Sequence, residues 1–501
     1  MALPADGAMI RAAVPGAAAR VHPSHPKGLG VLFIVEMWER FSYYGMRALL
    51  VLYLIASTSA VLEDGRANAN PGFGWTEEAA FTLYGLYTWS VYLTPIFGGW
   101  LADRFLGTHR SMLIGGWIIA AGHTTLALTE FAGISAGEAV TLKTSPAALA
   151  TFLAGLGLIA IGTGFFKPCV SVMVGQLYPA DDPRRDSGFT IFYMGINLGA
   201  LIAPLVAGTL GEMVGWHWGF AAAAVGMIAG LVCYQVLRPR TLQGVGLAPR
   251  ARVARRAASA ASEAELAPEP PPSVVRQRIA VILILALVAN VVFWAVFEQA
   301  GSSLNVFAKN STDRSLGPLF GAEGFPASWY QSINPLAILL FAPVFAWLWP
   351  ALDRRGRNPS TPAKFSWGLF LLGMAFIAML FGSIQARETG IAGPQWLLVT
   401  YVVCTWGELC LSPVGLSMVT RLAPPRLQSL MMGLWFFSLS LGNLFGGLAA
   451  RFSRRLETGE ASFVLEGLPG FFLLLVVLPM AAGVLILLLT PLLRRMMHGV
   501  E

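Results

Sequence analysis

Long apolar stretches recur along the chain and are separated by polar segments. A helix that crosses a bilayer needs about 20 mostly apolar residues. Twelve stretches reach that length, at positions 29–56, 77–102, 110–130, 147–176, 187–210, 216–237, 279–304, 328–350, 364–384, 393–418, 428–450 and 469–493. This pattern predicts an all-α membrane protein with twelve transmembrane helices.

The polar segment 238–278 divides these stretches into two sets of six. It contains an alanine and serine run and the prolines Pro268, Pro270, Pro271 and Pro272, a composition typical of a linker. The organisation that we expect is a disordered cytoplasmic tail (1–28), an N-terminal six-helix bundle (29–237), a cytoplasmic linker (238–278), a C-terminal six-helix bundle (279–493) and a second cytoplasmic tail (494–501).

The two halves share a short motif. Asp103 and Arg104 follow the second stretch, and Asp353 and Arg354 follow the eighth, about half the chain later. A motif at corresponding points of two halves indicates duplication. Its first copy lies in the run G-x-L-A-D-R-x-x-G at positions 99–107, which resembles the loop signature of the major facilitator superfamily. We therefore expect two six-helix bundles with the major facilitator fold.

Composition and charge agree with a lipid environment. Hydrophobic residues make up 55% of the chain and charged residues 12%, with a mean hydropathy of +0.64, whereas soluble domains carry about 25% charged residues. The net charge is +7, but the lysines and arginines lie mostly in short loops on the side of the two termini, as cytoplasmic loops do. This distribution indicates cytoplasmic termini in a bacterial inner (plasma) membrane and argues against a nucleic-acid partner.

The cysteines give no sign of a metal site or a disulfide framework. They form no C-x-x-C pair, and all four lie inside apolar stretches: Cys169, Cys233, Cys404 and Cys410. Small apolar packing residues are the expected role of such cysteines. We expect no metal and no bound cofactor.

Charged groups inside the apolar stretches mark the expected functional site, because each costs roughly 2.5–3.5 kcal/mol at the centre of a spanning helix. The first stretch carries Glu36, Glu39, Arg40, Tyr43 and Tyr44. Positions 36, 40, 43 and 44 share one face of a helix. One glutamate can pair with the arginine, and the second is then a candidate to carry a proton.

Further polar groups interrupt stretches of both halves. Lys167 precedes Pro168 in the fourth stretch, Glu298 lies one turn after Trp294 in the seventh, and Asn334 begins the eighth. The tenth stretch contains Glu408 within Trp406–Pro413. Four carboxylates and two cations from the two halves could converge on one central cavity. Such a cavity would suit a zwitterion, whose carboxylate and ammonium ends need opposite charges.

Several of these residues also carry a family resemblance. The run Glu36–Gly45 resembles the E-x-x-E-R-F-x-Y-Y-G motif of the proton-dependent oligopeptide transporter family. Phe192–Gly199 resembles the fifth-helix signature of that family, and the segments Phe293–Leu304 and Glu408–Trp435 are also similar. The resemblance covers nearly the whole chain, from Lys27 to Pro491.

The resemblance implies roles for individual residues. Arg40 and Lys167 would hold the carboxylate end of a peptide, and the amino end would contact Asn197, Asn334 and Glu408. The whole expected substrate site is Arg40, Tyr43, Tyr92, Lys167, Asn197, Trp294, Asn334, Glu408, Ser412 and Trp435. Proton coupling and gating would involve Glu36, Glu39, Arg40, Lys167, Glu298 and Glu408, with Arg40–Glu298 and Lys167–Glu408 as gating pairs.

The chain departs from the family pattern at two places. Many bacterial members insert two helices between the halves, whereas residues 238–278 are too polar to span a membrane here. Mammalian-type members carry a histidine on the second helix at the position of Gly85. Proton coupling is therefore expected to rest on carboxylates.

Together these features predict a symporter, not an enzyme, that imports di- and tripeptides and peptide-like compounds with protons as the coupling ion. Its expected partners are peptides, protons and membrane lipids. Three alternatives remain: a transporter of the same fold for another small anion such as nitrate, a non-transporting receptor, and a membrane enzyme.

Overall fold

The computed structural model describes residues 24–58, 68, 70–133, 145–179, 182, 184–247, 270–315, 324–424, 427–461 and 463–500. The expected tail residues 1–23 and most of the expected linker, 248–269, lie outside the described residues.

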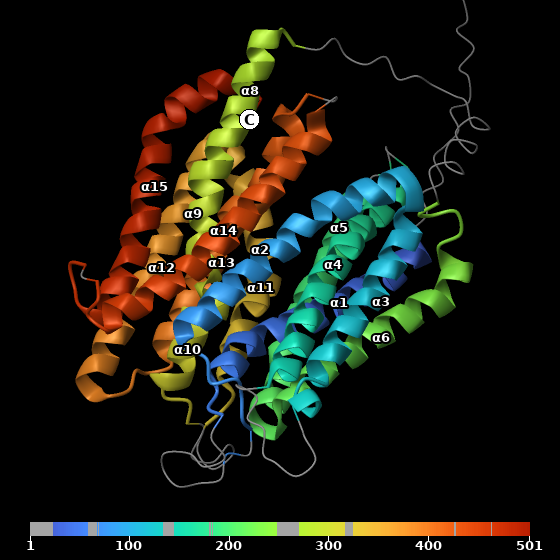
Figure 1. The fold of residues 1–501 in the computed structure, drawn as a ribbon. Coiled ribbons are helices and arrows are strands. Elements are labelled where there is room, and N and C mark those ends of the chain that lie inside the picture. The colour runs from blue at the N-terminus through green and yellow to red at the C-terminus, as the bar shows by residue number, and fades with distance from the viewer. Residues whose placement is uncertain are drawn as a thin grey trace, which may run out of the picture.

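The first six predicted stretches are helices (Figure 1). They are α1 (Lys27–Ile55), α2 (Glu77–Leu101) with its continuation η1 (Ala102–Leu106), α3 (Thr108–Ala127) followed by the turn η2 (Phe131–Gly133), α4 (Pro146–Gln176), α5 (Arg185–Ala203) with its continuations η4 (Pro204–Gly208) and η5 (Leu210–Val214), and α6 (Trp216–Thr241).

The last six stretches are also helical. The seventh is divided into α8 (Pro272–Ile284), η6 (Leu285–Asn290), α9 (Val291–Phe297), η7 (Glu298–Gly301) and α10 (Ser303–Asn310), and the eighth into η9 (Ala327–Ser332) and α11 (Ile333–Asp353). The remaining four are α12 (Thr361–Thr389), α13 (Gln395–Leu422), α14 (Gln428–Glu457) and α15 (Gly467–Met497).

The helices have the lengths that a bilayer requires. Within the described part of the chain, nine helical segments are both long and apolar enough to cross a membrane. The other three, α1, α2 and α3, have 29, 25 and 20 residues and are more polar. In α1 the added polarity comes from Glu36, Glu39, Arg40 and Arg47, all buried. The twelve predicted helices are therefore present.

Two groups of helices lie side by side (Figure 1): α1, α3, α4, α5 and α6 form one group, and α8, α9 and α12–α15 form the other. The helices α2 and α14 pack across the boundary, as do α5 and α11. A Cβ atom on Gly85 of α2 would lie 2.9 Å from the Cα of Gly447 on α14, which is too close for a side chain. A histidine at position 85 would therefore have to displace α14.

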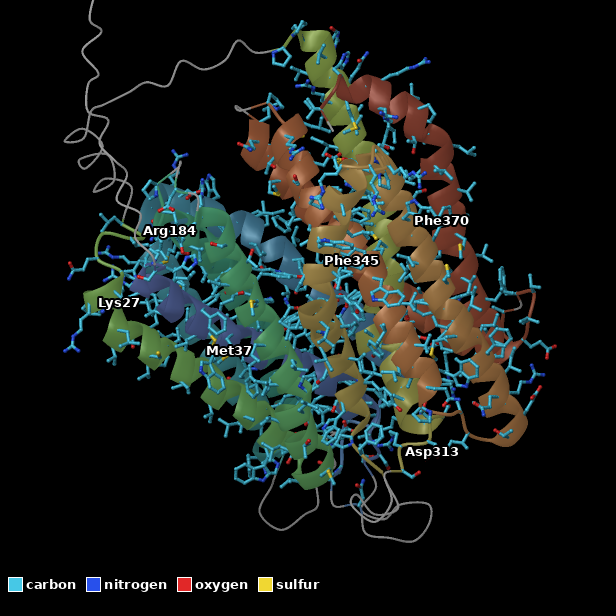
Figure 2. All side chains as sticks on the ribbon, turned by 180° about the vertical axis from the view of Figure 1, so that it is seen from behind. Lys27, Met37, Arg184, Asp313, Phe345 and Phe370 are labelled. Atoms are coloured by element: carbon cyan, nitrogen blue, oxygen red, sulfur yellow. The ribbon has the colours of Figure 1, made fainter. Side chains whose placement is uncertain are left out.

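Both described ends of the chain lie at one end of the molecule. Figure 2 shows Lys27 and Arg184 toward this end and Asp313 at the opposite end. The last turn of α15 meets the start of α8, where Arg278 Nε donates a hydrogen bond to the Met497 carbonyl at 3.3 Å. The end that carries Lys27 and Arg184 is called the terminal end below, and the end that carries Asp313 the opposite end.

Candidate functional site

A buried charge cluster lies on α1. Arg40 Nε lies 3.1 Å from Glu36 Oε1 and 2.5 Å from Glu39 Oε2, and all three residues are at most 5% exposed. Two carboxylates thus face one guanidinium: Glu36 at the i, i+4 spacing that we predicted, and Glu39 as the adjacent residue. Glu39 Oε1 and Arg40 Nη2 are buried without a hydrogen-bond partner among the described residues. One carboxylate oxygen and one guanidinium nitrogen therefore remain available to a proton and to a ligand.

Lys167 on α4 extends the positive charge beside this cluster. Its ammonium nitrogen lies 3.7 Å from the centroid of the Tyr92 ring on α2, within the range of a cation–π contact. Lys167 also interacts electrostatically with Glu36 and Glu39. The two cations that the resemblance assigns to a substrate carboxylate thus both lie inside the N-terminal half, Arg40 buried and Lys167 half-buried.

A second buried ion pair joins the two halves. Arg47 Nη2 on α1 lies 2.7 Å from Glu298 Oε2, and the two side chains are 6% and 2% exposed. Tyr84 on α2 completes the contact, since its hydroxyl accepts from Arg47 Nε at 2.8 Å and donates to Glu298 Oε2 at 3.1 Å.

The expected gating pair Arg40–Glu298 is not formed in this conformation. Glu298 lies level with Arg47, two turns further along α1 than Arg40, and the structure pairs those two residues. Lys167 and Glu408 are likewise held by other partners, the Tyr92 ring and Asn334.

Arg47 is the residue that the sequence analysis missed. The signal was present, because positions 36, 40, 43/44 and 47 follow one another at helical spacing on one face of α1. The guanidinium of Arg47 also lies 5.6 Å from the Tyr44 ring and 5.9 Å from the Tyr84 ring. The charged face of α1 is thus about one turn longer than we expected.

On the other half, Glu408 and Asn334 form a polar pair. Asn334 Nδ2 on α11 donates to Glu408 Oε2 on α13 at 2.9 Å and to Thr405 Oγ1 at 2.9 Å. Glu408 is 9% exposed, and no cation is paired with it among the described residues. It is therefore a carboxylate that could accept an ammonium group.

A small cavity lies between the halves and collects many of these residues. Its walls are Tyr44, Arg47, Tyr92, Ala200, Pro204, Trp294, Phe297, Glu298, Ala300, Gln331, Asn334, Pro335, Tyr401 and Glu408. Five of the thirteen predicted site residues line it. Its volume of ≈ 70 Å³ would hold about two water molecules at roughly 30 Å³ each, so a peptide needs a wider cavity than this conformation provides.

The other eight predicted residues are not among those that line this cavity. Tyr43 is buried beside Arg40, and Asn197 Nδ2 donates to the Tyr193 carbonyl within α5. Ser412 is half-buried, one turn after Glu408 on α13. Trp435 lies in the packing of the C-terminal half, edge-on to Phe365 at 5.9 Å.

Hydrogen bonds also join the two halves directly. Asn305 donates to the Ala48 carbonyl at 2.8 Å, and Ser440 on α14 donates to the Trp89 carbonyl on α2 at 2.8 Å. Together with Arg47–Glu298, these contacts hold the halves against each other, Ser440–Trp89 near the middle of α14 and α2 and the other two further toward the opposite end. A ligand could leave or enter on that side only after they separate.

In the described part of the chain, twelve membrane-length helices around a cavity lined by charged groups define a multi-pass membrane transporter. The model of the POT family matches residues 109–240 and 272–464, more than half of the chain. The chain belongs to the POT family.

Known relatives agree with this assignment. The peptide transporter YePEPT of Yersinia enterocolitica is 37% identical, with 95% of this chain and 96% of the relative covered. A di-/tripeptide transporter of Lactococcus lactis is 36% identical over 82% and 86% of the two chains. A crystal structure of a mutant peptide transporter POT in complex with alafosfalin has a TM-score of 0.77 at 35% identity, covering 95% and 96%. The predicted major facilitator fold is thereby confirmed.

Proposed function

We propose that this protein is a proton-coupled symporter that imports di- and tripeptides and peptide-like compounds, and that it acts as a transporter without enzymatic activity. Its place would be the bacterial inner membrane, with both termini in the cytoplasm. The observation that carries the proposal is the distribution of charge between the two halves: the cations Arg40 and Lys167 lie on the N-terminal half, and Glu408, which has no cation partner among the described residues, lies beside the amide of Asn334 on the C-terminal half. The names of the relatives agree with this substrate class.

A peptide would bridge the two halves. Arg40 and Lys167 would receive its carboxylate, because an arginine fork binds a carboxylate with two parallel hydrogen bonds. Glu408 and Asn334 would receive its amino end. Tyr43, Tyr92, Asn197, Trp294, Ser412 and Trp435 would form the remaining walls of the widened site. A ligand held at both ends favours approach of the halves, which is how alternating access moves a central site between two openings.

The proton would enter the charge cluster of α1. Glu36 and Glu39 compete for one guanidinium, and the second oxygen of Glu39 lacks a partner in the described structure. Protonation of one carboxylate would leave Arg40 with a single charged partner and free its remaining nitrogens for the peptide. Peptide and proton would then favour each other's binding, which is the requirement for symport.

Gating would use the charged residues that face each other across the halves. Glu298 would hold the opposite side closed through Arg47. Lys167 and Glu408 would approach each other when the terminal side closes, because they belong to different halves and Glu408 is free of cations here. The expansion of the ≈ 70 Å³ cavity would accompany the same motion.

The function is tested by uptake of dialanine into proteoliposomes that contain the purified full chain. An inward proton gradient is expected to drive accumulation of the peptide above the external concentration, and a proton-conducting ionophore should abolish it. Accumulation that does not depend on the gradient would contradict coupling. Uptake of nitrate or another small anion in place of peptide would contradict the substrate class.

Glu408→Gln is expected to lower uptake of dialanine by roughly tenfold or more, since a hydrogen bond to a charged group is worth about 1.5–3 kcal/mol. Uptake of N-acetyl-dialanine, which has no ammonium group, should change little. Uptake of both peptides is measured side by side. Glu388→Gln, at the exposed end of α12, is the control and should leave both unchanged. An equal loss for the two peptides would contradict the assigned role.

A further inference from the structure

A row of contacts runs between the end of α5 and the start of the segment η9–α11. Ser332 Oγ donates to the Leu201 carbonyl at 2.8 Å, and Trp329 Nε1 donates to Thr209 Oγ1 at 2.9 Å. Gly208 lies against Ser328, whose side chain occupies the place of a Cβ atom on that glycine. Positions 201, 208, 209 and 212 share one face of a helix. This face points at the other half of the molecule.

Glu212 ends the row and is its only charged member among these residues. Its Oε2 accepts from the backbone N–H of Ala327 at 3.0 Å, and its Oε1 accepts from the backbone N–H of Ser328 at 3.0 Å. Lys309 Nζ lies 3.8 Å from Oε2. The side chain of Glu212 is 4% exposed, and that of Lys309 is 37% exposed. Both oxygens of a buried carboxylate from one half are thus satisfied by the backbone of the other half.

We infer that Glu212 is a gating residue, which holds the opposite side of the transporter closed by binding the start of η9. A desolvated carboxylate is costly unless its oxygens have partners, and the amides of a helix start favour negative charge. When the halves separate, water replaces both sets of partners. The contact is therefore strong enough to favour the state in which the opposite side is closed, and it can still break in each transport cycle.

Glu212 acts at a different place from the ion pair of Arg47 and Glu298. That pair joins α1 and η7 beside the cavity, whereas Glu212 joins η5 and η9 next to the loop that contains Asp313, which Figure 2 places at the opposite end. Neutral neighbours such as Thr209 and Ser332 align the two segments. The charge of Glu212 sets how firmly they stay together.

The role is tested by distances between spin labels in the full chain, with the four native cysteines replaced by alanine. Labels at the exposed positions Val214 and Asn310 report the opposite side, and labels at Ser187 and Thr420 report the terminal side. In Glu212→Gln, the glutamine keeps the shape but loses the charge and one acceptor. The population with a long Val214–Asn310 distance should rise by roughly tenfold to a hundredfold.

The distance between Ser187 and Thr420 should shorten in the same sample, because the two sides open alternately. A local structural defect would broaden the first distance without this reciprocal change. Glu130→Gln is the matched control: Glu130 also lies toward the opposite end, but it pairs with His217 of the same half at 2.6 Å. It should leave both distances as in the unsubstituted protein.

Unchanged distances in Glu212→Gln and in Glu212→Ala would overturn the inference, as would equal shifts in Glu130→Gln. The importance of a gate rests on the function proposed above. The distances are nevertheless measured without substrate, so failure of dialanine uptake would contradict peptide transport alone and leave the gating result standing.

Discussion

Replacing Glu39 by glutamine is expected to lower proton-driven accumulation of dialanine by roughly a hundredfold while exchange of labelled for unlabelled peptide continues. Glu39 is 1% exposed, and its Oε2 lies 2.5 Å from Arg40 Nε. Glutamine imitates the protonated carboxylate and leaves Glu36 as the charged partner of the arginine. The variant then behaves as if Glu39 were always protonated. It can exchange peptide across the membrane, but Glu39 no longer binds and releases a proton.

Accumulation and exchange are measured in the same proteoliposomes, the first with an inward proton gradient and the second with equal pH and peptide on both sides. Glu457→Gln serves as the control, because Glu457 pairs with Arg454 on α14 at 2.8 Å, away from the cavity. Full accumulation by Glu39→Gln would contradict a coupling role. Equal loss of accumulation and exchange would assign Glu39 to peptide binding or folding.

The spanning helices are predictable from the sequence because lipid imposes length and apolarity on each of them. Their ends are less predictable where a helix continues into water. α6 runs to Thr241 and α8 begins at Pro272, whereas the apolar stretches end at 237 and begin at 279. A hydropathy pattern shows where a helix leaves the lipid and not where the helix ends. A helix with arginines in its last turns can therefore extend beyond the lipid into water.

The charged residues of the site are predictable for a related reason, since a charge inside an apolar helix rarely serves packing. Which charges pair is not predictable in this way. The partner of Glu298 depends on the height at which η7 meets α1, because one helical turn separates Arg40 from Tyr44 and another separates Tyr44 from Arg47. The contacts of Glu212 are even harder to predict. Its partners are backbone amides, which every residue except proline has, so the sequence of side chains does not identify them.

Replacing Arg47 by methionine is expected to destabilise the protein by about 3–5 kcal/mol, because it leaves Glu298 buried without its cation. The exposed fractions of 6% and 2% show that the pair is shielded from bulk water. Tyr84 could still donate one hydrogen bond to Glu298, but a hydroxyl does not neutralise a carboxylate. The midpoint of thermal unfolding of the purified protein in detergent should fall by several degrees.

The double variant Arg47→Met with Glu298→Leu should recover most of this stability, since replacing both members of a buried pair by apolar side chains is often neutral or stabilising. Arg454→Met, which breaks the more exposed pair with Glu457 (46% and 22% exposed), should cost at most about 1 kcal/mol. If the double variant unfolds at as low a temperature as Arg47→Met, the loss of stability does not come from an unpaired carboxylate.

Measuring peptide uptake separates stability from gating. The double variant should remain a poor transporter despite its recovered stability. The charged pair is hydrated when the opposite side opens, whereas an apolar contact between α1 and η7 would be exposed to water without gaining any hydration energy.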